Sequence, residues 1–277
     1  MTILKISDEF QAELKALLKS SQSPKETIDI LSKSTQFSNL LTSLEKILKE
    51  DKFVQFRGGE LSNYNFFFTA LVSCFGEYYG IIEHTGIKIE CDYTGCSRNQ
   101  LVLHNDDAID IERQPQVGFI QVIKEDPVLR VHNGIVLIRE LIRELKFKDP
   151  ELLNSLLTTP VPMCSYGVNY DGENKKRLVI KEPILSKDKS GYKVRFDFER
   201  INFYYKDKNE KQPYEESKMI FDFLQYANSI KKALFLEVGD ILIQNTKETL
   251  HDRDECSIEL GTNGKLNSRE ILVSFAR

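Results

Sequence analysis

Polar and apolar positions over the first fifty residues follow the period of a helix. Apolar residues recur at helical spacing through IDILSKSTQFSNLLTSLEKILKE, residues 28–50. Ser7 is followed by two acidic residues and Ser23 by Pro24, and both arrangements are typical of helix starts. The pattern therefore predicts an N-terminal helical segment over residues 1–50.

From residue 51 the pattern changes to short β-rich runs that are separated by turn residues. FVQFRGG (53–59) is typical of a strand that ends in a glycine turn, and YNFFFTALVSCFGEYYG (64–80) can form a buried helix. Helical patterns return at residues 135–146 and 214–234. The predicted strands of this region are GIKIECDY (86–93), QLVLH (100–104), VGFIQVIKE (117–125), RLVIKEPIL (177–185), YKVRFDFERINFYY (192–205), LFLEV (234–238), DILIQ (240–244) and EILVSFA (270–276).

Many short strands with this spacing favour a β-sandwich or barrel. The strands do not alternate regularly with helices, so a doubly wound parallel sheet is disfavoured. We predict a mainly β fold, a jelly-roll core over residues 51–277 with flanking and inserted helices. Together with the helical segment 1–50 it would form a single domain, 1–277.

Composition and charge narrow the classes of function. The chain has 277 residues and a net charge of −4, with acidic and basic residues interspersed, so no basic patch predicts a nucleic-acid partner. The longest apolar stretch, residues 66–75, is too short to span a bilayer, and the N-terminus lacks the apolar core of a secretory signal. The odd number of scattered cysteines predicts reduced thiols in a cytoplasmic protein. Cys91 and Cys96 lack the second pair that a structural zinc site requires.

The segment LVLHNDD (101–107) carries the first candidate chemistry. If it is a strand, His104 and Asp106 point to the same face and could bind one metal ion. An aspartate-rich turn at the end of a strand explains the same residues, and this segment alone leaves both interpretations open. Of the other histidines, His84 and His132 have no neighbours that indicate a ligand.

His251 and Arg269 extend the metal interpretation. With His104 and Asp106, His251 would complete a set of two histidines and one carboxylate, which holds Fe(II) on one face and leaves positions open for a cosubstrate and O2. A 2-oxo acid that chelates iron needs a cation for its far carboxylate, and a guanidinium binds that group bidentately. Arg269, at the start of the last strand, is the preferred anchor; Arg253 and Arg277 are weaker candidates.

Four segments, in this order, resemble the Fe(II)/2-oxoglutarate-dependent oxygenases of the TauD/TfdA, clavaminate-synthase-like group. They are FVQFRGG, LVLHND, VGFIQVIKEDP and EVGDILIQNTKETLHDR. The resemblance implies a double-stranded β-helix, which is a cupin-like jelly roll. It also implies that His104, Asp106 and His251 hold Fe(II) and that Arg269 binds 2-oxoglutarate.

The sequence departs from the family pattern in two places. The family often has a GGxT motif whose threonine contacts 2-oxoglutarate, whereas this chain has RVHNGIVL, in which His132 or Asn133 could substitute. The run from His251 to Arg269 is a few residues longer than in many relatives. Related halogenases replace the metal-binding carboxylate with a small residue, so Asp106 indicates oxygenation rather than halogenation.

The resemblance implies hydroxylation of an unactivated C–H bond, with 2-oxoglutarate and O2 converted to succinate and CO2. We expect a small-molecule substrate, an amino acid or carboxylate that is free or tethered to a carrier. A protein hydroxylase or demethylase of the JmjC type, a non-catalytic jelly-roll binding protein and a metal-free structural role are the alternatives. Polar residues around the HxD segment could line a substrate pocket or form a solvated loop: Ser97, Arg98, Asn99, Asp107, Glu112 and Arg113.

Overall fold

The computed structural model describes residues 2–19, 21, 23–58, 66–78, 83–87, 95–109, 114–165, 177–262 and 264–277. Its helices are α1 (Asp8–Leu18), α2 (Pro24–Leu31), α3 (Thr35–Asp51), α4 (Phe67–Ser73), α5 (Ile138–Lys148), α6 (Pro150–Thr158), α7 (Phe198–Lys208) and α8 (Tyr214–Ser229). Its strands are β1 (Ile3–Lys5), β2 (Phe53–Arg57), β3 (Glu83–Gly86), β4 (Leu101–His104), β5 (Val117–Lys124), β6 (Asn133–Leu137), β7 (Val161–Cys164), β8 (Val179–Glu182), β9 (Leu185–Asp188), β10 (Gly191–Val194), β11 (Lys232–Leu234), β12 (Asp240–Asn245), β13 (Thr249–Arg253), β14 (Ile258–Leu260), β15 (Leu266–Ser268) and β16 (Glu270–Ala276).

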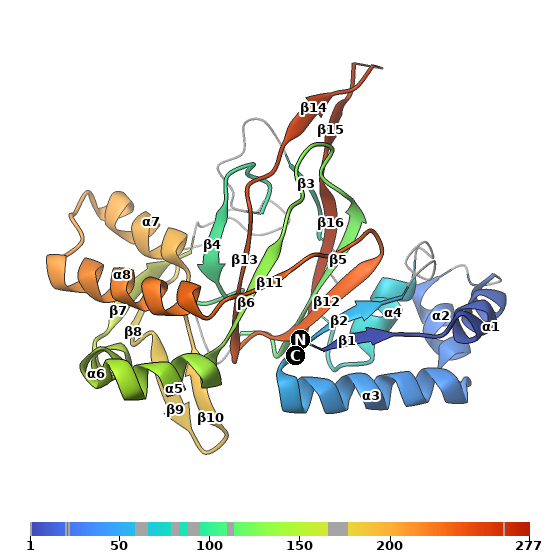
Figure 1. Ribbon diagram of the computed structural model, residues 1–277, viewed down its shortest axis with the longest axis horizontal. Coiled ribbons are helices and arrows are strands. Elements are labelled where there is room, and N and C mark those ends of the chain that lie inside the picture. The colour runs from blue at the N-terminus through green and yellow to red at the C-terminus, as the bar shows by residue number, and fades with distance from the viewer. Residues whose placement is uncertain are drawn as a thin grey trace.

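Two sheets form the centre of the molecule (Figure 1). One has the strand order β1-β2-β12-β5-β16-β3, and the other has the order β11-β6-β13-β4. Apolar side chains from both sheets, among them Ile120, Ile135 and Leu242, meet in one buried cluster. The two sheets therefore pack face to face, as in a jelly roll. The hairpin of β14 and β15 projects from this core.

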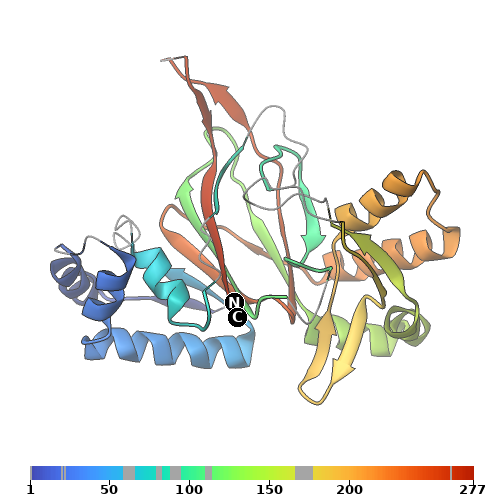
Figure 2. The ribbon, with the colours of Figure 1, turned by 180° about the vertical axis from the view of Figure 1, so that it is seen from behind.

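Helices cover the outer face of each sheet, at opposite ends of the molecule (Figures 1 and 2). Helices α1 to α4 pack on the six-stranded sheet, where Ile241 and Ile243 lie in their apolar cluster while Leu242 faces the other sheet. Helices α5 to α8 pack on the four-stranded sheet against Leu103 and Leu250. Because side chains alternate along a strand, the residues that follow these two leucines face the space between the sheets.

The N-terminal helices begin where the sequence predicts them. Ser7 and Ser23 accept hydrogen bonds from the backbone N–H groups of Phe10 and Glu26, respectively, and so cap α1 and α2. The pattern over residues 28–50 is not one helix, since Ser34 caps a new helix, α3. The short strand β1, which pairs in parallel with β2, was not predicted.

Three predicted segments contain a change of secondary structure that the sequence pattern did not indicate. Residues 135–137 belong to strand β6, and the predicted helix begins only at Ile138. The predicted strand 192–205 ends at Val194; Asp197 then caps helix α7. The predicted helix 214–234 ends at Ser229 and is followed by β11. Helix α6, which Asp149 caps, was missed. Short apolar runs fit a buried strand and a buried helix equally well, and tertiary pairing decides between them.

The cysteines correct one expectation from the sequence. Cys74, Cys164 and Cys256 are free thiols, as predicted, but Cys96 is disulfide-bonded. A cysteine in a disulfide cannot serve as a zinc ligand. Cys91 and the segment 88–93 of the predicted strand 86–93 lie outside the described residues.

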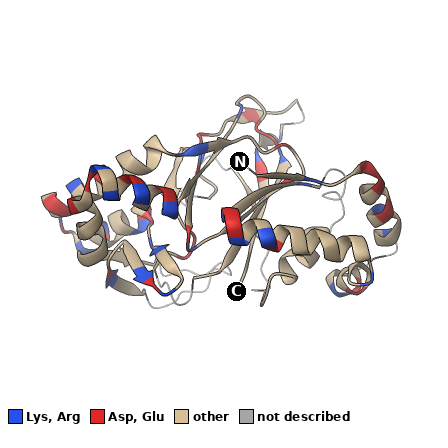
Figure 3. Ribbon diagram, turned by 60° about the horizontal axis from the view of Figure 1, so that its bottom comes forward, with Lys and Arg blue, Asp and Glu red and all other residues tan. Residues whose placement is uncertain are grey.

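Charged residues are distributed over both helical ends, with basic and acidic side chains intermixed (Figure 3). Glu248 links the two ends of the fold, because it forms ion pairs with Lys52 at 3.0 Å and with Lys193 at 2.8 Å. Burial alone would raise the pKa of Glu248, but hydrogen bonds from the two lysines outweigh it and lower the pKa. Among the described helices, none is long and apolar enough to cross a membrane.

Candidate active site

The two histidines of the candidate site lie on neighbouring strands and are direct partners. In the antiparallel pair of β4 and β13, His104 is opposite His251, and their ring centroids are 4.3 Å apart. Both face the interior, because Leu103 and Leu250 face the helices. His251 lies within strand β13, a segment that the sequence pattern did not predict as a strand.

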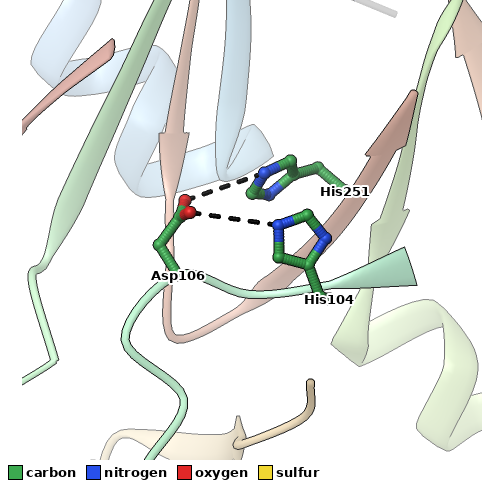
Figure 4. A group of neighbouring side chains, drawn as sticks. All are labelled: His104, Asp106 and His251. Atoms are coloured by element: carbon green, nitrogen blue, oxygen red, sulfur yellow. Dashed lines mark ion pairs between the residues drawn. The ribbon is translucent and has the colours of Figure 1, made fainter. Parts of the chain in front are cut away.

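Asp106 reaches the histidines from just beyond the end of β4. The sequence led us to expect that Asp106 lies on the same strand face as His104. Strand β4 ends at His104, however, so Asp106 approaches the histidines from the turn that follows. The chain turns at Asp107, whose φ of 50° lies in the left-handed region that aspartate tolerates better than most residues. The Asp106 carboxylate oxygens lie 4.0 Å from Nε2 of His104 and 3.7 Å from Nε2 of His251 (Figure 4).

These three side chains could hold one metal ion. One ligand atom from each lies within 4.8 Å of the others. Among the described residues, no other group of three His, Cys, Asp or Glu side chains comes this close. The donor set is two imidazole nitrogens and one carboxylate oxygen, which suits Fe(II) with open coordination positions.

Asn105, between two candidate ligands, points the other way and fastens the segment to its surroundings. Its buried side chain donates to Val194 O at 3.0 Å and to Thr246 O at 3.1 Å, and its Oδ1 accepts from Phe196 N at 2.7 Å. The role of Asn105 in positioning the ligands was not predicted, because its partners are far away in the sequence.

Both imidazoles are oriented through Nδ1, which leaves Nε2 for the site. Nδ1 of His104 lies 2.9 Å from Val102 O, an acceptor that requires a proton on Nδ1. Nδ1 of His251 lies 2.9 Å from Nε2 of Gln244. If Nε2 of His251 binds a metal, Nδ1 carries the proton and the Gln244 amide must present its oxygen, which a rotation of 180° provides.

Burial shifts the pKa values of two residues of the site. It raises the pKa of the Asp106 carboxyl; the electrostatic interaction with His104 opposes this shift, and the charge of Asp197 reinforces it. Burial also lowers the pKa of His251 well below its usual value, and His104 adds to this effect. A neutral His251 offers a lone pair to a metal, and a bound cation would offset the cost of the buried carboxylate.

The three residues open into a cavity between the sheets. Its wall is apolar on one side, with Ile120, Ile271 and Val273, and Arg269 lies on it. Arg269 is buried, and its Nη2 donates to Oδ1 of Asn133 at 3.0 Å. Asn133, one of the two residues considered as a substitute for the family threonine, therefore contacts the predicted anchor.

Of the remaining histidines and candidate arginines, only Arg253 lines the cavity. His132 contacts Asp254 at 3.2 Å and His84 contacts Glu270 at 3.0 Å, so neither joins the candidate ligands. Arg253, a weaker candidate in the sequence, lines the cavity. Arg277 pairs through its backbone with Glu77.

The polar residues on either side of the HxD segment differ in exposure and in their contacts with the candidate site. Arg98 and Asn99 are exposed, and the backbone carbonyls of Ser97 and Asn99 accept hydrogen bonds from Arg253. Burial raises the pKa of Asp107, which the nearby charge of Arg200 opposes. Glu112 and Arg113 lie outside the described residues.

Comparisons with known proteins identify the fold. No protein-family model matches the sequence, and no curated protein matches it. Among solved structures, an asparagine oxygenase in complex with Fe(II), 3-hydroxyasparagine and succinate is similar with a TM-score of 0.75, at 13% identity over 100% of this chain and 93% of that chain. The non-heme iron oxygenase OrfP, with Fe and α-ketoglutaric acid, has a TM-score of 0.68 at 11% identity, over 100% and 94% of the two chains. The double-stranded β-helix predicted from the sequence is thereby confirmed.

Proposed function

We propose that residues 1–277 form one Fe(II)/2-oxoglutarate-dependent dioxygenase domain that hydroxylates an unactivated C–H bond of a small amino-acid-like or carboxylate substrate. The balanced reaction consumes the substrate, 2-oxoglutarate and O2, and it yields the hydroxylated product, succinate and CO2. The observation that carries the proposal is the placement of His104, Asp106 and His251 around one point of a cavity that Arg269 also lines. The fold shared with two non-heme iron oxygenases supports it.

The residues fit the metal that the proposal requires. Their donor atoms converge without a fourth protein ligand among the described residues, as an open catalytic site needs. Bound Fe(II) would supply the O2 chemistry, for which these side chains have no substitute. His104 and His251 would present Nε2 to the ion, while Val102 and Gln244 fix the orientation of the rings.

Arg269 would bind the carboxylate of 2-oxoglutarate that is remote from the metal. Its position on the cavity wall and its hydrogen bond to Asn133 hold the guanidinium in place before the cosubstrate arrives. Ile120, Ile271 and Val273 make the cavity apolar beside this cation. A desolvated guanidinium binds a carboxylate more strongly than a hydrated one.

The substrate class follows from the two neighbours. One holds 3-hydroxyasparagine, and OrfP was crystallised with L-Arg and with hydroxylated arginines. Both products carry the new hydroxyl group on the carbon chain of an amino acid. We infer that this chain acts on an amino acid, free or tethered to a carrier. Asp106 favours hydroxylation over halogenation, because it occupies the ligand position that a halide would need.

A JmjC-type activity is less well supported. Such enzymes commonly bind the cosubstrate through a lysine, whereas among the described residues arginine and no lysine lines the cavity.

Two measurements test the proposed function. Fe(II) and 2-oxoglutarate are titrated anaerobically, and the chelate should give a visible charge-transfer absorption. Succinate release is then measured with a panel of free amino acids that includes asparagine and arginine, and with carrier-tethered forms. Asp106→Ala should remove both signals. If the wild-type protein gives no absorption band, it is a binding protein and the proposal fails; normal turnover by Asp106→Ala would refute the ligand assignment.

A further inference from the structure

A second buried guanidinium lines the same cavity as the candidate metal ligands. Arg253 lies two residues after His251 on β13, and side chains two residues apart on a strand share a face. Directly opposite Arg253 in the sheet register is Asn133, the residue that holds Arg269. Both arginines are only 4% exposed.

The hydrogen-bond partners of Arg253 are neutral, and they contact only its two terminal nitrogens. Its Nη2 donates to Ser97 O and Asn99 O, each at 2.7 Å, and its Nη1 donates to Sγ of Cys256 at 2.7 Å. Burial raises the pKa of the Cys256 thiol, so the sulfur is not a thiolate that could neutralise the arginine. The Nε donor of Arg253 is buried without a hydrogen-bond partner. A buried charged donor without a partner is costly, and such a group points to a missing ligand.

The two guanidinium groups act on each other. Burial lowers the pKa of Arg269 to about 10, and the charge of Arg253 acts in the same direction, whereas Cys256 and the carboxylate of Asp126 oppose the shift. Arg269 still remains charged at neutral pH. Two like charges in one desolvated region repel each other, and an anion between them would relieve that repulsion. Among the described residues, the hydrogen bonds of these two guanidinium groups go only to neutral acceptors.

We propose that Arg253 is a second cation of the cosubstrate site, whose Nε donates to the same remote carboxylate of 2-oxoglutarate that Arg269 binds. The inference rests on the proposed function. The two guanidinium groups are held by different partners. Arg269 donates to the side-chain amide of Asn133, while Arg253 donates to two backbone carbonyls of the segment that precedes β4. Cosubstrate binding would thereby also fasten residues 97–99, next to the strand that carries His104.

The test measures binding rather than turnover. The protein is loaded with Mn(II), and 2-oxoglutarate is titrated anaerobically by calorimetry into the wild type, Arg253→Met and Arg269→Met. 2-Oxopentanoate serves as the second ligand, because it keeps the chelating end and has a methyl group in place of the remote carboxylate. Arg253→Met should bind 2-oxoglutarate about 10- to 100-fold more weakly than the wild type, because it loses the hydrogen bond from Nε to the charged carboxylate. Binding of 2-oxopentanoate should change by less than about 2-fold, since the lost contact involves only the remote carboxylate.

Two further variants separate a contact with the cosubstrate from a structural role. Cys256→Ala removes a partner of Nη1 but keeps Nε, so its affinity for 2-oxoglutarate should stay near that of the wild type. Arg139→Met, an exposed arginine outside the cavity, controls for the loss of a charge. If Arg253→Met weakens both ligands equally, or neither, Arg253 has only a structural role and the inference is overturned.

The outcome also distinguishes this inference from the proposed function. If the wild type binds 2-oxoglutarate, Arg269→Met loses it and Arg253→Met retains it, then only the inference about Arg253 fails. If the Mn(II)-loaded wild type does not bind 2-oxoglutarate, the proposed function fails as well.

Discussion

Replacement of Asn105 by alanine tests how the HxD segment is held. The variant loses three buried hydrogen bonds, to Phe196 N, Val194 O and Thr246 O. Each such bond contributes about 0.5 to 1.5 kcal/mol net, and a buried N–H left without a partner costs about 1 to 3 kcal/mol. Gln114 also donates to Thr246 O, at 3.4 Å, so that carbonyl keeps a partner. We therefore expect Asn105→Ala to lower the free energy of unfolding by about 3 kcal/mol.

The assay for this prediction is urea unfolding, followed by circular dichroism, with and without Mn(II). Asn154→Ala is the matched control, because Asn154 is exposed on helix α6 and should change stability little. Asn105 lies between the candidate ligands His104 and Asp106, so Asn105→Ala should also bind Mn(II) more weakly than the wild type. A loss of less than about 1 kcal/mol, which is within the range of one hydrogen bond, would refute the argument that Asn105 fastens the segment.

Three other predictions follow from the described contacts. Gly134→Ala should unfold at clearly lower urea concentration, because a Cβ there would overlap the Asp252 carboxylate, whereas Gly86→Ala meets only ordinary contacts and should not. Glu248→Gln should be less stable than the wild type at pH 7; since the pKa of Glu248 is lowered on folding, this gap should close as the pH falls below the ordinary value of 4.5, which acid titrations of both proteins would check. Mn(II) at 100 times its dissociation constant should stabilise the wild type by about 2.7 kcal/mol in thermal unfolding, and Asp106→Ala should lose this effect.

The sequence was sufficient to select the candidate ligands that the fold brings together, but not the residues that support them. The candidate ligands and Arg269 have side chains whose types and order suggest a metal and an anion. Gln244 and Asn105 have ordinary side chains, and their roles come from partners that only the folded sheets bring near. Asn133 was one of two candidates, and its hydrogen bond to Arg269 separates it from His132.

The errors in the predicted secondary structure also arise from partners that are distant in the sequence. Residues 135–137 form a strand because β13 and β11 pair with β6 on either side, and these partners follow more than ninety residues later. The local pattern IVLIRELIRELK fits a helix throughout, and it is a helix from Ile138 onward. In contrast, Asp197 and Arg200 form a local N-cap and an i,i+3 ion pair that marked the start of α7 in the sequence itself.

The direction of the Arg253 side chain depends on the secondary structure of the segment around His251. The sequence pattern predicted no strand around His251, so the direction of the Arg253 side chain was undefined and Arg269 was the preferred anchor. Strand β13 in fact continues through Arg253, and alternation then turns both side chains toward the cavity. The candidate metal ligand His251 and the cation of Arg253 therefore lie two residues apart on one strand. If both proposals hold, a change at either residue should alter the binding of 2-oxoglutarate, through the metal at one end and through the remote carboxylate at the other.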